Sequence, residues 1–211
     1  FSALASDAYG NTVPGAVFTW TSGVGMIDSS GVLTAQTLPV TGSVTATSGS
    51  VSGSAAVTVV AGALHHIIVL PDPVTVQIGG SFTFMASAYD QYNNPLAGIG
   101  FVWTTNVGTI DQTGNFIPQT AVATGWVAAA NGTITDQATV TLLPGPLDHI
   151  IVLPNPSTVI VGQTRQFTAR GFDLYENEIA GLTFTWSTDI GSVDATGLFT
   201  AQAVPDTGVV N

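Results

Sequence analysis

Cysteine and lysine are both absent from this 211-residue sequence, and charged side chains of any kind are few. Without cysteine the chain can form neither a disulfide nor a thiolate metal site. Without lysine it cannot form a lysine–asparagine isopeptide cross-link. Charged residues make up 7% of the chain, far below the usual quarter, and 45% of it is hydrophobic. This composition argues against intrinsic disorder.

Positive charge is especially scarce, since 13 acidic residues stand against two arginines and give a net charge of −11. Such a chain repels phosphate backbones and anionic lipid headgroups, which excludes nucleic-acid and polybasic membrane binding. The most apolar stretch, residues 55–70, is broken by polar residues and a glycine. We therefore predict no membrane span in this segment.

Catalytic motifs are also missing. The sequence contains no nucleophile in a recognisable motif, no HExxH zinc motif and no phosphate-cradling glycine loop. The aspartates recur at positions typical of turns, which accounts for them without a reaction. We expect the protein not to be an enzyme.

What the sequence does contain is a gapless internal repeat of 83 residues. Trp20, Trp103 and Trp186 mark it (103 − 20 and 186 − 103). Further sets at the same spacing are Asp7, Asp90 and Asp173; Tyr9, Tyr92 and Tyr175; Asn11, Asn94 and Asn177; and Gly31, Gly114 and Gly197. A unit of this length is too long for a solenoid coil and has the size of a small β-sandwich.

The repeat predicts three domains: 1–61, without its N-terminal strand; a complete domain over 62–144; and 145–211, without its C-terminal strands. Short linkers mark the joints, Ala61-Gly62-Ala63 and Pro144-Gly145-Pro146. We expect these domains to be part of a longer array, joined as a semi-rigid rod.

Alternating apolar residues indicate strands throughout each repeat. Residues 82–88 place Phe82 and Phe84 on one face, and residues 101–103 point Phe101 and Trp103 inward. No helical periodicity lasts two turns. About seven strands per repeat, turn signals between them and a central tryptophan predict an all-β, immunoglobulin-like sandwich with Trp20, Trp103 and Trp186 in the three cores.

Several motifs are shared with a known class of domain: Asp7-Ala8-Tyr9-Gly10-Asn11 with Val13-Pro14-Gly15, Phe18-Thr19-Trp20, Ile27-Asp28-Ser29-Ser30-Gly31-Val32-Leu33-Thr34-Ala35, and Val44-Thr45-Ala46-Thr47. In these motifs the chain resembles the bacterial immunoglobulin-like repeats of the invasin and intimin type. The resemblance implies a cell-surface or extracellular setting and no catalysis. Such repeats serve as stalks, spacers, adhesin tips and subunits of layers or filaments.

The loop after each repeated aspartate is the main candidate for a metal site. Calcium requires six or more oxygen ligands, and the third repeat offers Asp173, Glu176, Asn177 and Glu178. The alternative is a loop held by Asx-type hydrogen bonds. Asp28, Asp111 and Asp194 each precede a glycine by three residues, which favours a structural turn over the alternative of a metal role.

Two further residues in the middle repeat are candidates for surface contacts. Trp126 has Ser43 and Val209 at its place in the other repeats, and the strand parity points it outward. It is a candidate for stacking on a sugar or on a neighbouring subunit, with cover by a loop as the alternative. Asn131 begins the one glycosylation sequon, at a predicted hairpin tip, which makes a glycan a further partner to consider.

These observations favour a structural repeat segment of an extracellular microbial surface protein: a filament, a surface layer or a stalk. The expected partners are copies of itself or neighbouring domains of a longer chain. The alternative is an adhesin module that binds a host receptor or a carbohydrate. No cofactor other than calcium is suggested.

Overall fold

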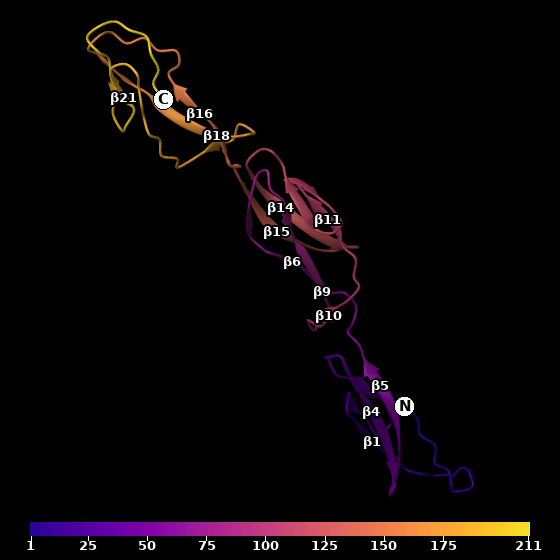
Figure 1. Cartoon of the computed structure of the whole chain (residues 1–211). Coiled ribbons are helices and arrows are strands. Elements are labelled where there is room, and N and C mark those ends of the chain that lie inside the picture. Colours follow the sequence, from indigo (N-terminus) through magenta and orange to yellow (C-terminus); the bar gives the residue numbers. More distant parts are fainter. The chain divides into compact units, whose positions relative to one another are not determined.

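The computed structural model describes all residues from 1 to 211 and contains strands but no helix (Figure 1). The predicted all-β class is therefore confirmed. Because there is no helix, none is long and apolar enough to cross a membrane.

The middle repeat contains ten strand segments: β6 (His66–Leu70), β7 (Val74–Gln77), β8 (Phe82–Thr83), β9 (Met85–Tyr89), β10 (Pro95–Leu96), β11 (Val102–Thr105), β12 (Gly108–Ile110), β13 (Asn115–Pro118), β14 (Ala123–Asn131) and β15 (Ile134–Leu143). They form three sheets with the orders β10-β9-β6, β11-β14-β15-β7 and β12-β13-β8. Some segments are pieces of one strand. Only Phe84 separates β8 from β9, and Pro71 and Pro73, which lack a ladder donor, lie between β6 and β7.

The core of the middle repeat follows the predicted alternation. Phe84 and Ala88 are buried, whereas Thr83 and Met85 between them are exposed. Facing strands contribute the remaining buried apolar side chains: Ile67, Val69, Val76, Ile78, Trp103, Val107, Phe116, Val127, Ala128, Ala129, Ala138, Val140 and Leu142. Phe84 packs edge-on against Phe116, with 5.9 Å between the ring centroids. An apolar core fixes the register, because a shift of one residue would expose it.

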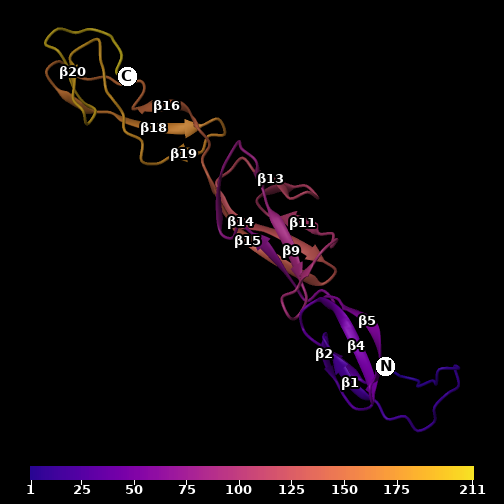
Figure 2. The same ribbon diagram turned by 60° about the horizontal axis from the view of Figure 1, so that its bottom comes forward.

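The first repeat contains β1 (Thr19–Ser22), β2 (Gly25–Ile27), β3 (Leu33–Ala35), β4 (Val40–Ser48) and β5 (Val51–Val59). Its sheets have the orders β1-β4-β5 and β2-β3, and Figure 2 shows β4 between β1 and β5. Residues before Thr19 form no strand, apart from an isolated bridge between Ser6 and Thr12. β5 is the last strand in the order of its sheet.

The third repeat contains β16 (Leu147–Leu153), β17 (Thr164–Gln166), β18 (Thr168–Asp173), β19 (Glu178–Ile179), β20 (Ser192–Val193) and β21 (Leu198–Thr200). Its sheets have the orders β16-β18-β19 and β17-β21-β20. β16 pairs antiparallel with β18 from Leu147–Asp173 to Leu153–Thr168.

The repeated tryptophans lie in equivalent surroundings. In each repeat the Cζ2 edge of the indole faces the glycine eleven residues further on, which has a φ of about 80°. A Cβ on Gly31, Gly114 or Gly197 would come within 3.2, 3.3 or 2.8 Å of that atom. Trp103 is 7% exposed, whereas Trp20 and Trp186 are half-buried. The same local core therefore recurs, most fully closed in the middle repeat.

By its internal contacts the chain divides into two compact units. One comprises Phe1–Ile68, Ala86–Val102 and Ala129–Asp136, and the other Val69–Met85, Trp103–Ala128 and Gln137–Asn211. This division passes through the middle repeat, whereas the sequence predicts boundaries after residues 61 and 144. Those boundaries stay a prediction.

Candidate functional site at the repeat junctions

A tight loop connects β9 to β10 in the middle repeat, and its aspartate is the best-bonded polar side chain of the region. Asp90 Oδ1 accepts hydrogen bonds from the backbone N–H groups of Tyr92 (2.8 Å) and Asn94 (2.9 Å). The Asn94 side-chain amide donates to Asp90 Oδ2 (2.8 Å). The predicted Asx-type loop is thus present, and the backbone of Asn93 within it is left-handed.

The same side chains also bond residues outside the loop. Gly62 N–H, in the linker before β6, donates to Asp90 Oδ2 (2.8 Å). The Asn94 amide also donates to the carbonyl oxygen of Thr37, in the first repeat (2.7 Å). Asp90 is 1% exposed and Asn94 4%. These four residues, Thr37, Gly62, Asp90 and Asn94, are called the first junction, and all of them lie within one compact unit.

A second junction, made by Thr120, Gly145, Asp173 and Asn177, repeats this arrangement 83 residues later. Gly145 N–H donates to Asp173 Oδ2 (2.7 Å), and the Asn177 amide donates to Thr120 O (2.8 Å). Asn177 Oδ1 additionally accepts from Val122 N–H (3.3 Å). Asp173 is 1% exposed, and the whole set again lies within one unit.

The first repeat shows the same loop with hydrogen bonds inside the loop. Asp7 accepts from Tyr9 N–H (2.9 Å), from Asn11 N–H (2.8 Å) and from the Asn11 amide (3.0 Å), and these bonds all stay within the loop. Both Asp7 and Asn11 are exposed. The loop therefore closes by its own bonds, and the buried aspartates Asp90 and Asp173 are those that also bond a glycine N–H outside the loop.

The tyrosine of this loop also differs in exposure between the repeats. Tyr9 is 91% exposed, whereas Tyr92 is 52% and Tyr175 43% exposed. All three tyrosines are exposed, and those beside the two junctions are less exposed than Tyr9.

Opposing effects set the charge state of the junction aspartates. Burial by itself raises the pKa of Asp173, but hydrogen bonds from the Asn177 side chain and from the backbone of Gly145, Asn177 and Tyr175 outweigh it. The net result is a pKa of about 2 for Asp173, below its usual 3.8. The pKa of Asp90 is lowered in the same way against the effect of burial. Both aspartates are carboxylates at neutral pH and act as acceptors only.

The left-handed loop position differs in sequence but not in conformation. It is Gly10 in the first repeat, Asn93 in the middle one and Glu176 in the third, with φ angles of 84°, 63° and 65°. A glutamate rarely adopts this conformation. The bonds that Asp173 accepts on both sides of Glu176 hold the backbone there.

The calcium candidates of the third repeat are only partly brought together. Asp173 is buried with both carboxylate oxygens hydrogen-bonded, and Asn177 spans the junction. Glu178 lies 3.5 Å from the Arg170 guanidinium, and Glu176 lies 3.6 Å from His149 Nε2. No group of three or more histidine, aspartate or glutamate side chains suited to a metal ion is present in the chain. Calcium binding at these residues stays an untested hypothesis beside the Asx-type loop.

The predicted turn aspartates form a second, purely local set. Asp28 Oδ1 accepts from Ser30 N–H (2.8 Å), from the Ser30 hydroxyl (2.7 Å) and from Val32 N–H (3.0 Å). Thr113 and Thr196 replace the serine at Asp111 and Asp194. Hydrogen bonding, led by the side-chain hydroxyl, lowers the pKa of each of these carboxyls. These groups close hairpins and do not reach a neighbouring repeat.

The surface candidates of the middle repeat lie on β14 and at its end. Trp126 is half-buried, next to the buried Val127, so its ring is only partly available to a ligand. Its backbone is fixed by Asn106 Oδ1, which accepts from Trp126 N–H (2.8 Å). Asn131 is exposed as the last residue of β14, and its side-chain amide donates to Gly100 O (2.9 Å). A contact role for Trp126 and a glycan on Asn131 both stay predictions.

No protein-family model matches the sequence, and no curated protein matches it. Among solved structures, the Escherichia coli adhesin FdeC is similar, with 19% identity, a TM-score of 0.50, and coverage of 80% of this chain and 67% of that one. Domains 4 and 5 of the S-layer protein SbsC show 24% identity, a TM-score of 0.37, and coverage of 67% of this chain and 80% of that one.

A longer SbsC structure covers this chain completely, with 21% identity and a TM-score of 0.38, and this chain spans 31% of its length. At these identities the likeness to the adhesin concerns the fold alone, and it agrees with the predicted immunoglobulin-like sandwich.

Sequence reasoning found the aspartate and asparagine of the junctions but not their partners. The acceptors are the backbone carbonyls of Thr37 and Thr120, and the donors are the N–H groups of Gly62 and Gly145. Backbone groups exist at every position, so no residue type marks them. The one available signal was that threonine and glycine recur there at the repeat spacing.

Proposed function

We propose that this chain is a structural repeat segment of an extracellular microbial surface protein, within a filament, a surface layer or a stalk. The observation that carries the proposal is the junction, which ties the linker and the preceding repeat to the same aspartate–asparagine pair and recurs after 83 residues. A structural array without catalytic function requires contacts that fix each repeat relative to the one before it.

The junction favours a fixed joint over a flexible tether. Opening the first junction would expose or orphan the buried Asp90 carboxylate, and charged groups make the stronger hydrogen bonds of proteins. Gly62 N–H would lose its acceptor at the same time. Because the linker and the preceding repeat are both bonded to one loop, a single loop restrains two segments.

The surface composition also supports a role in assembly. Large apolar side chains are exposed in every repeat, among them Val17, Met26, Met85, Leu70 and Ile160. Only two arginines are available for ion pairs with 13 acidic residues. Extended apolar surface of this kind is typical of proteins that contact neighbours, or carry glycan, over much of their area.

The proposal is tested by measuring the spread of distances across the first junction. Spin labels on Ser50→Cys and Thr133→Cys occupy equivalent, exposed turns of the first two repeats in a chain with no other cysteine. We expect a narrow distance distribution by double electron–electron resonance. Asp90→Ala combined with Asn94→Ala should broaden it, and Asp7→Ala combined with Asn11→Ala should leave it unchanged. A broad distribution in the parent chain would contradict the proposal.

The second candidate function is adhesion, and the observation that favours it is Trp126. A tryptophan occurs at this strand position only in the middle repeat, and its side chain is partly exposed. The similar E. coli structure is that of an adhesin. A glycan array that compares the parent chain with Trp126→Ala tests this role. Binding that is lost in the variant supports adhesion, and no binding by either leaves the structural role alone.

A further inference from the structure

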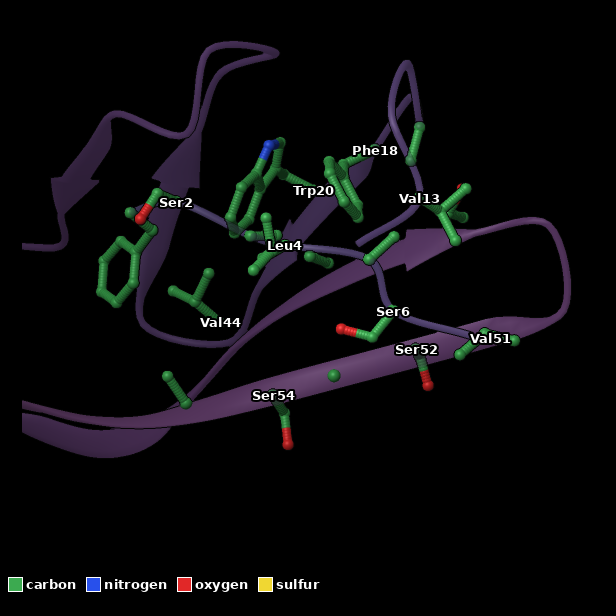
Figure 3. Close-up of a pocket in the computed structure, with 18 residues that line it drawn as sticks. Ser2, Leu4, Ser6, Val13, Phe18, Trp20, Val44, Val51, Ser52 and Ser54 are labelled. Atoms are coloured by element: carbon green, nitrogen blue, oxygen red, sulfur yellow. The ribbon is translucent and has the colours of Figure 1, made fainter. Parts of the chain in front are cut away.

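A cavity of about 520 Å³ in the first repeat is lined by apolar side chains and serines, and Figure 3 shows Trp20, Leu4 and Val44 beside it. None of the side chains that line it is a histidine, an aspartate or a glutamate. Candidate ligands for a metal ion are therefore found elsewhere. The three histidines of the chain all lie within five residues of the linker glycines Gly62 and Gly145.

His65 and His66 bring two ring nitrogens close together at the start of β6. Their Nδ1 atoms are 3.4 Å apart, and the two rings are nearly perpendicular, at 85°. The ring of His66 stacks on Tyr89, with 5.3 Å between the centroids, and His65 N–H donates to Tyr89 O (2.8 Å). Tyr89 of β9 therefore positions both members of the pair.

The distance between these two nitrogens matches the spacing of two ligands on a tetrahedral zinc ion. Zinc binds imidazole nitrogen at about 2.0–2.1 Å, so two ligands at the tetrahedral angle lie about 3.3–3.4 Å apart. Both rings would bind as neutral imidazoles through Nδ1 and carry their proton on Nε2. The pair therefore has the geometry of half a zinc site.

The third repeat has a different arrangement at the same place. Asp148 replaces His65, and His149 directs its Nδ1 to Asp148 Oδ2 (3.1 Å) and its Nε2 to Glu176 Oε2 (3.6 Å). Because the two nitrogens lie on opposite sides of one ring, these three side chains do not converge on a single ion. His149 therefore provides a control within the same chain.

We propose that the His65–His66 pair binds zinc together with the same pair of a second molecule of this chain. Structural zinc has four ligands, and no third histidine, aspartate or glutamate joins the pair within one chain. Two identical half-sites suit a two-fold axis through the ion.

The surroundings of the pair leave room for a partner. His65 is exposed, and Ile68, which points outward between the buried Ile67 and Val69, is 38% exposed and uncharged. Two chains that each carry a charge of −11 repel one another, so the contact depends on the cation. This pairing is separate from the role proposed for the junctions.

A zinc titration of the chain without an affinity tag, at pH 7.5, tests the site by calorimetry and sedimentation velocity. We expect one zinc ion per two chains and a dimer that EDTA returns to the monomer, whereas magnesium has no effect. His65→Ala changes an exposed residue and should weaken zinc binding at least about tenfold and abolish the dimer. His149→Ala is the matched control and should behave as the parent chain does.

Several results would overturn the proposal. A zinc-dependent dimer that persists in His65→Ala would show that carboxylates bind the ion, and an equal loss in both variants would show that the pair is not the site. A parent chain that binds no zinc, or that stays monomeric with zinc bound, would contradict it as well. The spin-label distances, measured within one chain in the presence of EDTA, test the junctions separately.

Discussion

The Asn94 amide nitrogen bonds two partners at once, Asp90 in its own repeat and Thr37 in the preceding one. Asn94→Ala removes both bonds, so the buried Asp90 carboxylate and the Thr37 carbonyl each lose one hydrogen-bond donor. We expect a loss of about 1–3 kcal/mol in the free energy of unfolding, measured by urea denaturation. Asn11→Ala, the equivalent change in an exposed loop, should cost no more than about 0.5 kcal/mol. Equal losses at the two positions would mean that Asn94 acts only within its loop.

Acid should weaken the second junction. The pKa of Asp173 is about 2 in the folded chain and 3.8 for an unperturbed group. Because the folded value is the lower one, the stability that ionised Asp173 contributes is complete above about pH 4 and is lost as the pH falls toward about 2. The urea midpoints of the parent chain and of Asp173→Asn should therefore converge between pH 5 and pH 2.5. A constant difference between the two midpoints would refute this assignment.

The same carboxylate bears on calcium. Asp173 already accepts hydrogen bonds from Gly145, Tyr175 and Asn177, so an ion would have to displace donors to reach it. Calcium sites need six or more oxygens. We expect neither EDTA nor added calcium to change the melting temperature. A fall of several degrees in EDTA, abolished by substitution of Glu176 and Glu178, would instead establish a calcium site in the third repeat.

At the scale of a single element, the β12–β13 hairpin depends on Gly114. Its φ is 84°, and a Cβ there would overlap the carbonyl oxygen of Phe84 and meet Trp103 Cζ2 at 3.3 Å. Gly132, in the β14–β15 turn, is also left-handed but has open space around it. We expect Gly132→Ala to cost about 1–2 kcal/mol, the penalty of the backbone conformation alone. Gly114→Ala should cost at least about 3 kcal/mol, since overlap adds to that penalty. Thermal denaturation of both variants gives the comparison.

The strands were the most predictable elements, because burial on one face imposes a visible period of two. Phe84 and Ala88 are buried with Thr83 and Met85 exposed, as the alternation predicted. Trp126 shows the limit of this reasoning. Strand parity points it outward, yet neighbouring structure leaves it half-buried. The junction partners could not be predicted for a different reason. The acceptor at Thr37 is a backbone carbonyl, which every residue type has, so the sequence does not mark it.

At the scale of the whole molecule, the repeat spacing anticipated the recurrence of the fold and of its turns, but not the division into compact units. Each unit holds one complete junction, and the boundary passes through the middle repeat. Linker composition marks where one sandwich ends in the sequence. It does not tell how strongly the side chains around Gly62 and Gly145 bind the flanking segments together.

Net charge leads to a prediction for the entire chain. A charge of −11 with only two arginines leaves most carboxylates without a cationic partner, so their mutual repulsion opposes the compact state. Raising sodium chloride from 10 to 300 mM should shorten the screening length and increase the melting temperature. The measurement is a salt series at pH 7, with a sucrose series of equal osmolality as the control. A melting temperature that falls with salt would show that attractive ion pairs dominate instead.

The junction has a consequence for how such a chain grows longer. Each internal repeat offers a carbonyl to its successor and an aspartate–asparagine loop to its predecessor, at positions that an 83-residue step reproduces without a gap. Duplication of any in-frame stretch of that length regenerates a working joint at both new borders. Unequal recombination within the gene would thus add or delete whole repeats. The length of the array could then differ between related proteins while the contacts at each junction stayed the same.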